Sequence, residues 1–435
     1  MPAVAQRADD QIILSRLETR AEAFLDNLAM GRLNYIRPEM TAPLRTTLSP
    51  DAVSSIFTNL YREGGGGNVL IGDGEARLHP DGTVAVRVPL EYIARRYDAH
   101  VTFTGLEFEA LVRDFEVTTA SDPKRTGPGS PPYAVAGLTK TQELQFSAPG
   151  GPLLHAVLTL PLTASEATPV PAVVIVAGAK AYDADMNDGD VKMARDLAEG
   201  LAAKGVAALR FEKRAHALAG TGGETGLTLE EAHLADATAA LVWLAAQPAI
   251  DRQRVTLAGI AFGAYLTPAL ARDPHVERTV LITPPPLLDV ESMRNRVYDE
   301  LDGAVVPTDE RSEVLKNRAD LIEAIASGAA DEDLMLFGLP GSWWPGIVDL
   351  RPKAELITLN KPFAVLDLDS NAHFGKPWRE AVAYSDGFGV WRGFDDLTQP
   401  APARFGEKPE GEHLHADVVM AVATYALRGN LPPQR

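Results

Sequence analysis

The stretch RVTLAGIAFGAYLTPALA, Arg254 to Ala271, contains the pattern that decides the fold. Val255 to Ala258 is a short apolar run, as in a buried strand, and an alanine-rich segment with helical character follows it. Between them lies the turn Gly259-Ile260-Ala261-Phe262-Gly263, in which two glycines stand four residues apart. Glycine permits a sharp turn and close packing of the following helix. The stretch therefore predicts a strand, a tight turn and a helix.

Composition excludes several classes of protein. The 435 residues are 46% hydrophobic and 23% charged, which is typical of a globular protein, and the length favours two domains. A net charge of -18 argues against nucleic-acid binding, because neutralising phosphates requires clustered Lys and Arg. Cysteine is absent, which excludes disulfides and thiolate metal sites and suits a reducing compartment. We find no signal-peptide pattern and no apolar run of 18 residues, and we expect a cytoplasmic protein without a membrane segment.

The first part of the chain predicts a small α+β domain over residues 1–117. Apolar residues recur at helical spacing from Ile12 to Leu28, whereas the pattern from Asn68 to Val117 alternates with period two. Helices followed by an antiparallel sheet make an α+β unit. The Pro/Gly/Ser-rich segment that follows indicates a linker over residues 118–135.

Residues 136–435 predict an α/β domain. Strand patterns and helix patterns alternate along it, which is typical of a mostly parallel sheet with right-handed crossovers. Pro171 to Gly178, PAVVIVAG, is a continuous apolar strand, as a sheet covered on both faces requires. A largely helical insertion, expected as a cap, interrupts the alternation at about residues 285–358.

This order of segments resembles the α/β-hydrolase superfamily, in particular a bacterial branch with an N-terminal α+β domain and a helical cap. The residues that carry the resemblance are the turn Gly259–Gly263, the segment MARDLAEGLAAKGVAALRFEKRAHA and the cap segment FGLPGSWWPGIVDLRP. The N-terminal part resembles a cone-shaped domain of the nuclear-transport-factor type. The resemblance implies a mostly parallel sheet flanked by helices, and a site at the turn, or nucleophile elbow, which such hydrolases write G-x-S-x-G.

The resemblance also implies three catalytic positions, and all three differ here. Ala261 occupies the position of the serine nucleophile, and a methyl group cannot attack an ester. Asn371 stands where the acid is expected, and an amide carries no charge to stabilise imidazolium. Gln399 stands at the position of the histidine and does not titrate. The sequence therefore predicts that the Ser-His-Asp triad positions are replaced.

Two segments near the elbow offer groups for binding a substrate oxygen. The backbone N–H of Phe262 follows the nucleophile position, and Ala179 lies on the loop that supplies the second oxyanion donor in the resembled superfamily. Lys180 on that loop is a candidate for polarising a carbonyl group, and Tyr182 for orienting a phenol or ketone. A solvated loop position is the alternative for Lys180 and Tyr182.

Histidines and tryptophans complete the candidate site. His373 is the candidate for proton transfer, because imidazole titrates near neutral pH. His216 follows a strand, where open α/β sheets bind ligands. Trp343 and Trp344 in the cap are candidates for an apolar surface against a polycyclic ligand, with ordinary packing as the alternative. No spacing indicates a metal site or a phosphate loop, and we expect no cofactor.

Three classes of function remain open at this stage. We expect a non-hydrolytic, cofactor-independent enzyme of natural-product, polyketide-type biosynthesis that catalyses addition, cyclisation or C–C coupling on a bulky aromatic small molecule. Such chemistry needs orientation and proton transfer more than a nucleophile. One alternative is a catalytically silent pseudohydrolase that binds a small molecule. The other is a hydrolase with relocated groups, or a serine esterase inactivated by substitution at position 261.

Overall fold

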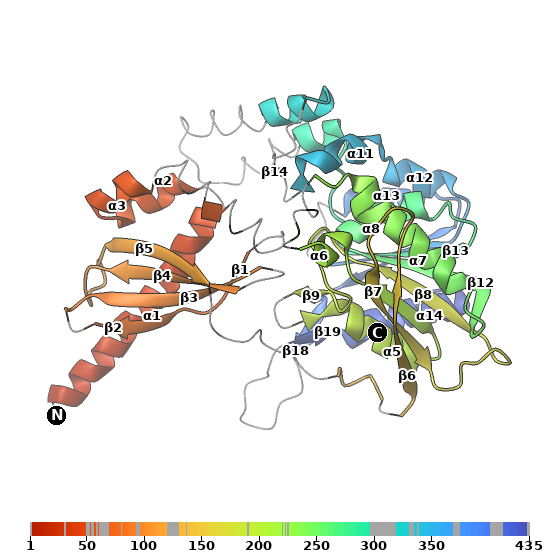
Figure 1. Cartoon of the computed structure of the whole chain (residues 1–435), viewed down its shortest axis with the longest axis horizontal. Helices are drawn as coiled ribbons and strands as arrows, with labels where there is room; N and C mark the ends of the chain where they lie inside the picture. Colours follow the sequence, from red (N-terminus) through yellow and green to blue (C-terminus); the bar gives the residue numbers. More distant parts are fainter. Residues whose placement is uncertain are drawn as a thin grey trace. The chain divides into compact units, whose positions relative to one another are not determined.

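The computed structural model describes most of the chain. The described residues are 2–29, 32–48, 69–119, 130–295, 319–329, 335–336, 339–368, 375–400 and 412–432, without 80, 93–95, 136, 189–190, 220, 222 and 224–225, together with Val53, Ile56, Phe57 and Leu60. The chain divides into two compact units, Met1–Arg125 and Thr126–Arg435, which are described separately below. Figure 1 shows both units and labels many of their elements.

The first unit packs one long helix on an antiparallel sheet. Its helices are α1 (Pro2–Ala29), α2 (Leu33–Ile36), the 3-10 turn η1 (Arg37–Glu39) and α3 (Ala42–Thr47), and its strands are β1 (Leu70–Ile71), β2 (Glu75–Leu78), β3 (Val84–Glu91), β4 (Arg96–Phe103) and β5 (Val112–Thr119). The strands pair in the order β1-β3-β4-β5, with β2 also on β3. Alternate residues of β3 are buried, and they join apolar residues of α1 in one core.

The strand β5 ends later than the sequence predicts. Thr118 and Thr119, which the sequence assigns to the linker, pair with Asp98 and Tyr97 of β4. Backbone pairing with β4 extends the strand past the last apolar residue of the alternating pattern. The predicted helix-to-sheet order of this unit agrees with the structure.

The second unit contains an eight-stranded, mostly parallel sheet. In chain order its strands are β6 (Thr139–Phe146), β7 (Leu154–Pro161), β8 (Val170–Val176), β11 (Ala207–Phe211), β12 (Ile250–Ile260), β13 (Val276–Ile282), β16 (Phe363–Leu368) and β17 (Gly389–Phe394). They lie in the order β17-β16-β13-β12-β8-β11-β7-β6, and only the pairs of β7 with β6 and β11 are antiparallel. This strand order, with an antiparallel second strand, is that of the α/β-hydrolase fold, as predicted.

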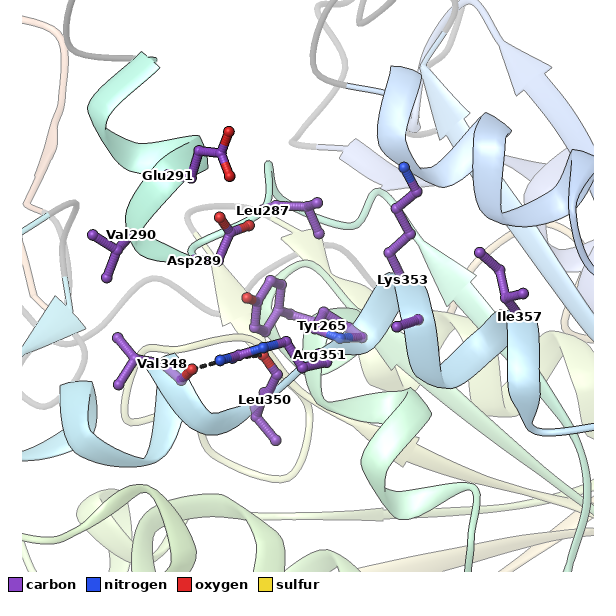
Figure 2. A pocket seen from close by; sticks show the side chains of 12 residues that line it. Tyr265, Leu287, Asp289, Val290, Glu291, Val348, Leu350, Arg351, Lys353 and Ile357 are labelled. Carbon is purple, nitrogen blue, oxygen red and sulfur yellow. Dashed lines mark hydrogen bonds between the residues drawn. The ribbon is translucent and has the colours of Figure 1, made fainter. Parts of the chain in front are cut away.

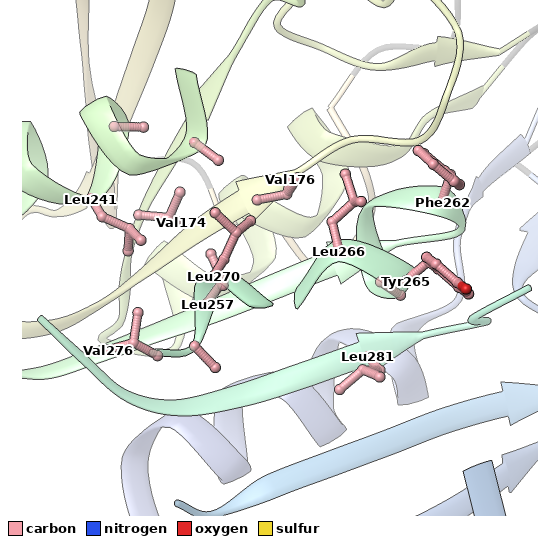
Figure 3. Packing of buried hydrophobic residues seen from close by; sticks show 14 of the residues in the cluster. Val174, Val176, Leu241, Leu257, Phe262, Tyr265, Leu266, Leu270, Val276 and Leu281 are labelled. Carbon is pink, nitrogen blue, oxygen red and sulfur yellow. The ribbon is translucent and has the colours of Figure 1, made fainter. Parts of the chain in front are cut away.

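Helices cover both faces of this sheet. The helices α7 (Ala235–Ala245), α8 (Phe262–Leu270), α12 (Pro352–Thr358) and α13 (Lys376–Ala383) share one apolar cluster, whereas α5 (Met193–Ala203) and α14 (Ala416–Arg428) share the other. Successive side chains of β8 point to opposite faces of the sheet and so join different clusters. Val174 and Val176 belong to the first cluster, and Val173 and Ile175 belong to the second. Figure 3 shows Val174 and Val176 beside Leu257 and Leu266 of the first cluster.

The insertion between β13 and β16 is helical in most of its described part. It includes the short ribbon β14 (Met335–Leu336) and β15 (Leu339–Pro340), the 3-10 turn η3 (Gly341–Trp343), α11 (Trp344–Asp349) and α12. Its apolar side chains, among them Ile347 and Leu356, join the cluster that covers α8. The cap therefore packs on the same side of the sheet as the helix that follows the elbow. Among the described helices, none combines the length and apolar character needed to cross a bilayer.

Candidate functional site

Ala261 occupies the tip of a strained turn between β12 and α8. Its backbone has φ 52° and ψ -119°, a conformation that costs a non-glycine residue about 1–3 kcal/mol. Its N–H donates to the carbonyl of Ile282 in β13 at 2.9 Å. This is the geometry of a nucleophile elbow, with a methyl group where a hydroxyl is expected.

The flanking glycines are required by backbone packing. A Cβ on Gly263 would lie 2.1 Å from the carbonyl oxygen of Val176, and one on Gly259 would lie 2.4 Å from the carbonyl oxygen of Gly263. Both distances are far below van der Waals contact. The two glycines of the motif therefore allow α8 to lie directly against the end of β8. The sequence predicts this close packing from the glycines of the turn.

The loop after β8 lies against the elbow. A Cβ built on Gly178 would be 3.7 Å from the Cβ of Ala261 and 3.4 Å from the ring of Tyr182. Tyr182 is buried, and the amine of Lys180 lies 5.9 Å from the centre of its ring. Ala179 is half-buried and packs against the same cluster as α8. Three of the residues predicted on this loop thus lie in one segment beside Ala261.

Phe262 connects the elbow to the cap. Its backbone N–H belongs to the first turn of α8, where amide groups have no partner within the helix. Its ring stacks on Trp343 with the ring centres 5.7 Å apart and on Tyr265 at 5.9 Å. Trp344 is fully buried in the core. The structure therefore brings Trp343 into contact with the residue after the nucleophile position.

A histidine that the sequence analysis did not select packs against the same rings, and a buried lysine contacts this histidine. Lys213 lies two residues after β11, and His233 lies in the π-helical turn η2 (Glu230–Leu234) that precedes α7. The amine of Lys213 contacts Nδ1 of His233. The ring of His233 meets Trp343 and Phe262 edge-on, with centres 4.4 and 5.3 Å apart. Single π-helical turns within helices occur often at functional sites.

Burial changes the protonation of both groups. Removal from water lowers the pKa of the Lys213 amine to about 7, although the carboxylate of Asp236 acts in the opposite direction. Burial also lowers the pKa of His233 well below its usual value, and the neighbouring Lys213 adds to the effect. His233 is therefore neutral at physiological pH, and Lys213 changes its charge near neutrality.

His216 has a local ionic partner. It lies in α6 (Arg214–Ala217), and its Nδ1 is 2.8 Å from a carboxylate oxygen of Glu212. That contact is the main favourable interaction that lowers the pKa of Glu212 against the opposing effect of burial. Arg214 beside it forms a buried ion pair with Asp236, at 2.6 Å. The substrate-binding role predicted for His216 stays a prediction.

Of the remaining predicted catalytic residues, the structure describes Gln399. Gln399 belongs to β18 (Thr398–Pro400), which pairs with β19 (Glu412–Leu414), and its side-chain oxygen accepts from the N–H of Ala416 at the start of α14. Asn371 and His373 fall outside the described residues. His413 lies opposite Gln399 in the ribbon, and its Nδ1 donates at 2.9 Å to the buried carboxylate of Asp196.

A cavity of about 460 Å³ lies in the cap, one helical turn from the elbow. Tyr265 of α8 lines it, together with Asp289 and Glu291 after β13 and with Arg351 and Lys353 at the start of α12 (Figure 2). The guanidinium of Arg351 donates to backbone carbonyls, and Lys353 pairs with Glu380. Ala261 does not line this cavity. The cavity lies within the volume range of small-molecule sites, and Tyr265, which lines it, stacks on Phe262.

The chain is similar in sequence to two groups of hydrolases. The X-Pro dipeptidyl-peptidase family (S15) matches residues 150–309, a range that includes the elbow, Lys213 and His233. Esterase EstD from Thermotoga maritima is 37% identical over 200 residues, which make up 46% of this chain and 46% of EstD. The chain therefore spans less than half the length of this relative.

Solved esterase structures match the chain at low overall similarity. Esterase Est22 is 16% identical with a TM-score of 0.42, over 68% of this chain and 82% of Est22. Brefeldin A esterase, a bacterial homologue of human hormone sensitive lipase, is 14% identical with a TM-score of 0.39, over 67% of this chain and 74% of that one. The fold assignment rests on the strand order and the elbow described above.

These similarities correct the functional expectation. A non-hydrolytic enzyme of natural-product biosynthesis that forms C–C bonds is wrong, because both sequence matches are to hydrolases, a dipeptidyl-peptidase family and an esterase. The alternative of an esterase inactivated at position 261 agrees better with them. By its strand order and its elbow, the second unit has the α/β-hydrolase fold, and the chain is similar in sequence to a dipeptidyl-peptidase family and to an esterase.

Proposed function

We propose that this chain is an esterase-type hydrolase-fold protein that has lost its nucleophile and binds a small carbonyl compound at the elbow without cleaving it. The observation that supports the proposal is Ala261 at φ 52° and ψ -119° between two glycines that admit no side chain. The strain of the turn and the close packing are retained, whereas the attacking oxygen is absent. The backbone N–H groups of the turn are sufficient to bind a carbonyl oxygen. Acyl transfer also needs the oxygen of a nucleophilic side chain.

The loss of the other triad members belongs to the same proposal. The sequence has Asn371 and Gln399 at the acid and histidine positions, and Gln399 holds the start of α14 through its side-chain oxygen. An amide at each position leaves no titrating group to activate a nucleophile. The proposed ligand has a bulky apolar or aromatic part, because Phe262 and Trp343 present stacked rings beside the elbow. A cytoplasmic location stays a prediction from the sequence.

Ester turnover and covalent labelling test the proposal. The native chain is expected to hydrolyse p-nitrophenyl esters no faster than its Ala261→Gly variant, and a fluorophosphonate probe is expected to leave it unlabelled. The Ala261→Ser variant is expected to acquire the label at residue 261, because the elbow and its backbone donors remain in place. Labelling of any serine in the native chain, or ester turnover that Ala261→Gly does not share, would contradict the proposal.

A further inference from the structure

The cavity in the cap is a second candidate site, and Ala261 does not line it. Its volume of about 460 Å³ is large enough for a molecule of one or two rings. Most of the side chains around it are apolar, and several of them are only half-buried, among them Leu287, Val290, Val348, Leu350 and Ile357 (Figure 2). This lining favours an apolar or aromatic ligand.

Tyr265 brings a polar group to this apolar lining. Its side chain is 1% exposed, and its hydroxyl oxygen accepts from the N–H of Leu288 at 3.2 Å. Within the described part of the chain, the hydroxyl proton has no acceptor at hydrogen-bond distance. Burial raises the pKa of the Tyr265 phenol, so the hydroxyl keeps this proton at physiological pH. A buried O–H donor is therefore left for an acceptor on a ligand.

The position of this hydroxyl is fixed by the packing around its ring. Tyr265 stacks on Phe262 with the ring planes 5° apart, and it meets Trp378 edge-on with the ring centres 6.2 Å apart. The indole N–H of Trp378 donates to the carbonyl of Pro285 at 2.9 Å. Together with the hydrogen bond from Leu288, these contacts hold the phenol before a ligand arrives. A donor held in this way loses little conformational freedom on binding.

The charged groups that line the cavity do not call for a charged ligand. The carboxylate of Asp289 accepts from the N–H and the hydroxyl of the serine three residues later. Lys353 pairs with Glu380, and the guanidinium of Arg351 donates to backbone carbonyls. Glu291 is exposed. Among the described lining residues, the charged groups are thus either paired within the chain or open to water, so an ionised ligand would lose its hydration without gaining a partner.

We propose that the cap cavity binds an uncharged aromatic carbonyl compound, whose oxygen accepts a hydrogen bond from the hydroxyl of Tyr265. The apolar side chains contact the ring system of the ligand and contribute most of the affinity. The single hydrogen bond selects a carbonyl compound over a hydrocarbon of the same shape. Because Ala261 does not line the cavity, this inference does not depend on the binding proposed for the elbow.

A matched pair of ligands separates the hydrogen bond from the apolar contacts. Methyl naphthyl ketone carries a carbonyl oxygen, and isopropenylnaphthalene has nearly the same shape without it. In equilibrium dialysis of the full chain, Tyr265→Phe is expected to weaken binding of the ketone by about three- to tenfold and to leave binding of the hydrocarbon within about twofold. The anion naphthoate is expected to bind the native chain at least about tenfold more weakly than the ketone does.

Two further variants assign the effect to the cavity. Ala354→Trp adds an indole to the lining at an exposed position of α12, and it is expected to weaken binding of both ligands more than about tenfold. Tyr425→Phe is the control, because its buried hydroxyl belongs to the apolar cluster on the other face of the sheet. It is expected to bind both ligands as the native chain does. A ketone bound at the elbow would appear as a further binding step that these variants leave unchanged.

Several results would overturn the inference. They are no binding of the ketone by the native chain, equal effects of Tyr265→Phe on the ketone and the hydrocarbon, native binding by Ala354→Trp, a loss in Tyr425→Phe equal to that in Tyr265→Phe, and binding of naphthoate as tight as that of the ketone. A change in the shape of the cavity affects both ligands of the pair, whereas loss of the hydrogen bond affects the ketone alone. The failure of the proposed function is observed separately, by phosphonate labelling of the native chain and of Ala261→Ser.

Discussion

Two groups of residues flank Phe262, and they differ in whether the sequence alone reveals them. On one side, the elbow at Ala261 keeps a motif that is visible in the sequence and a strained backbone, but it lacks a reactive group. On the other side, Lys213 and His233 form a buried ionisable pair that no short sequence motif predicts. The comparison teaches that the backbone geometry of a site can be recognised in a sequence, whereas buried titrating groups beside it have to be found in the structure.

The largest expected effect concerns the packing that holds the elbow. Gly263→Ala is expected to destabilise the fold by more than about 4 kcal/mol, because its Cβ would lie 2.1 Å from the carbonyl oxygen of Val176 and neither backbone can move freely. Urea denaturation followed by circular dichroism measures the change. Gly105→Ala is the control, since the nearest atom to its Cβ is 3.8 Å away, and an equal loss in both variants would contradict the packing account.

The next largest effect is a dependence of the free energy of unfolding on pH, which the buried amine of Lys213 causes. The folded-state pKa of Lys213, about 7, lies below its unfolded value of 10.5, so between these limits the unfolded chain binds a proton that the folded chain does not. Stability therefore rises with pH through this window, by at most about 1.4 kcal/mol per pH unit. Lys213→Met is expected to lose this rise.

Denaturation of the native chain and of Lys213→Met at pH 7, 8 and 9 measures the difference between their free energies of unfolding. The difference should change steadily with pH, because the other titrating groups contribute alike to both proteins. Parallel pH profiles would show that the amine of Lys213 is hydrated in the folded chain, which contradicts its burial.

The smallest effect isolates the strain at the nucleophile position. Ala261→Gly is expected to stabilise the chain by about 1 kcal/mol, because glycine adopts φ 52° without steric cost and this gain exceeds its entropic loss. Ala264→Gly, one turn into α8 with a helical backbone, is expected to destabilise by a similar amount. Melting temperatures of the two variants give the comparison, and a loss of stability in both would show that the elbow is unstrained.

The fold could be predicted because its signals are local. Alternating strand and helix patterns, the continuous apolar run of β8 and the spaced glycines around Ala261 all reflect short-range geometry. The end of β5 was missed by two residues, since pairing with β4 and not composition decides it. The sequence places Trp343 in the cap, and in the structure its ring stacks on Phe262 beside the elbow.

The chemistry beside the elbow was harder to predict because burial of a polar group is a tertiary property. Lys213 occupies a loop after a strand, where lysine is ordinarily solvated, and only the structure shows its amine enclosed. One signal for His233 was present: it stands four residues from both Leu229 and Ala237, on a face that is otherwise apolar and buried. The functional class was missed because the predicted replacement of the triad favoured non-hydrolytic chemistry, whereas the sequence matches are to hydrolases.

Covalent labelling of Ala261→Ser tests the central claim most directly. The account predicts that a fluorophosphonate adds to this variant slowly, and that peptide mass spectrometry places the adduct at residue 261, since backbone donors alone give about 10³–10⁴-fold acceleration over water. Ala269→Ser, on the same helix away from the turn, and the native chain should stay unlabelled. Equal labelling of Ala261→Ser and Ala269→Ser, or none in either, would contradict an intact elbow that lacks only its nucleophile.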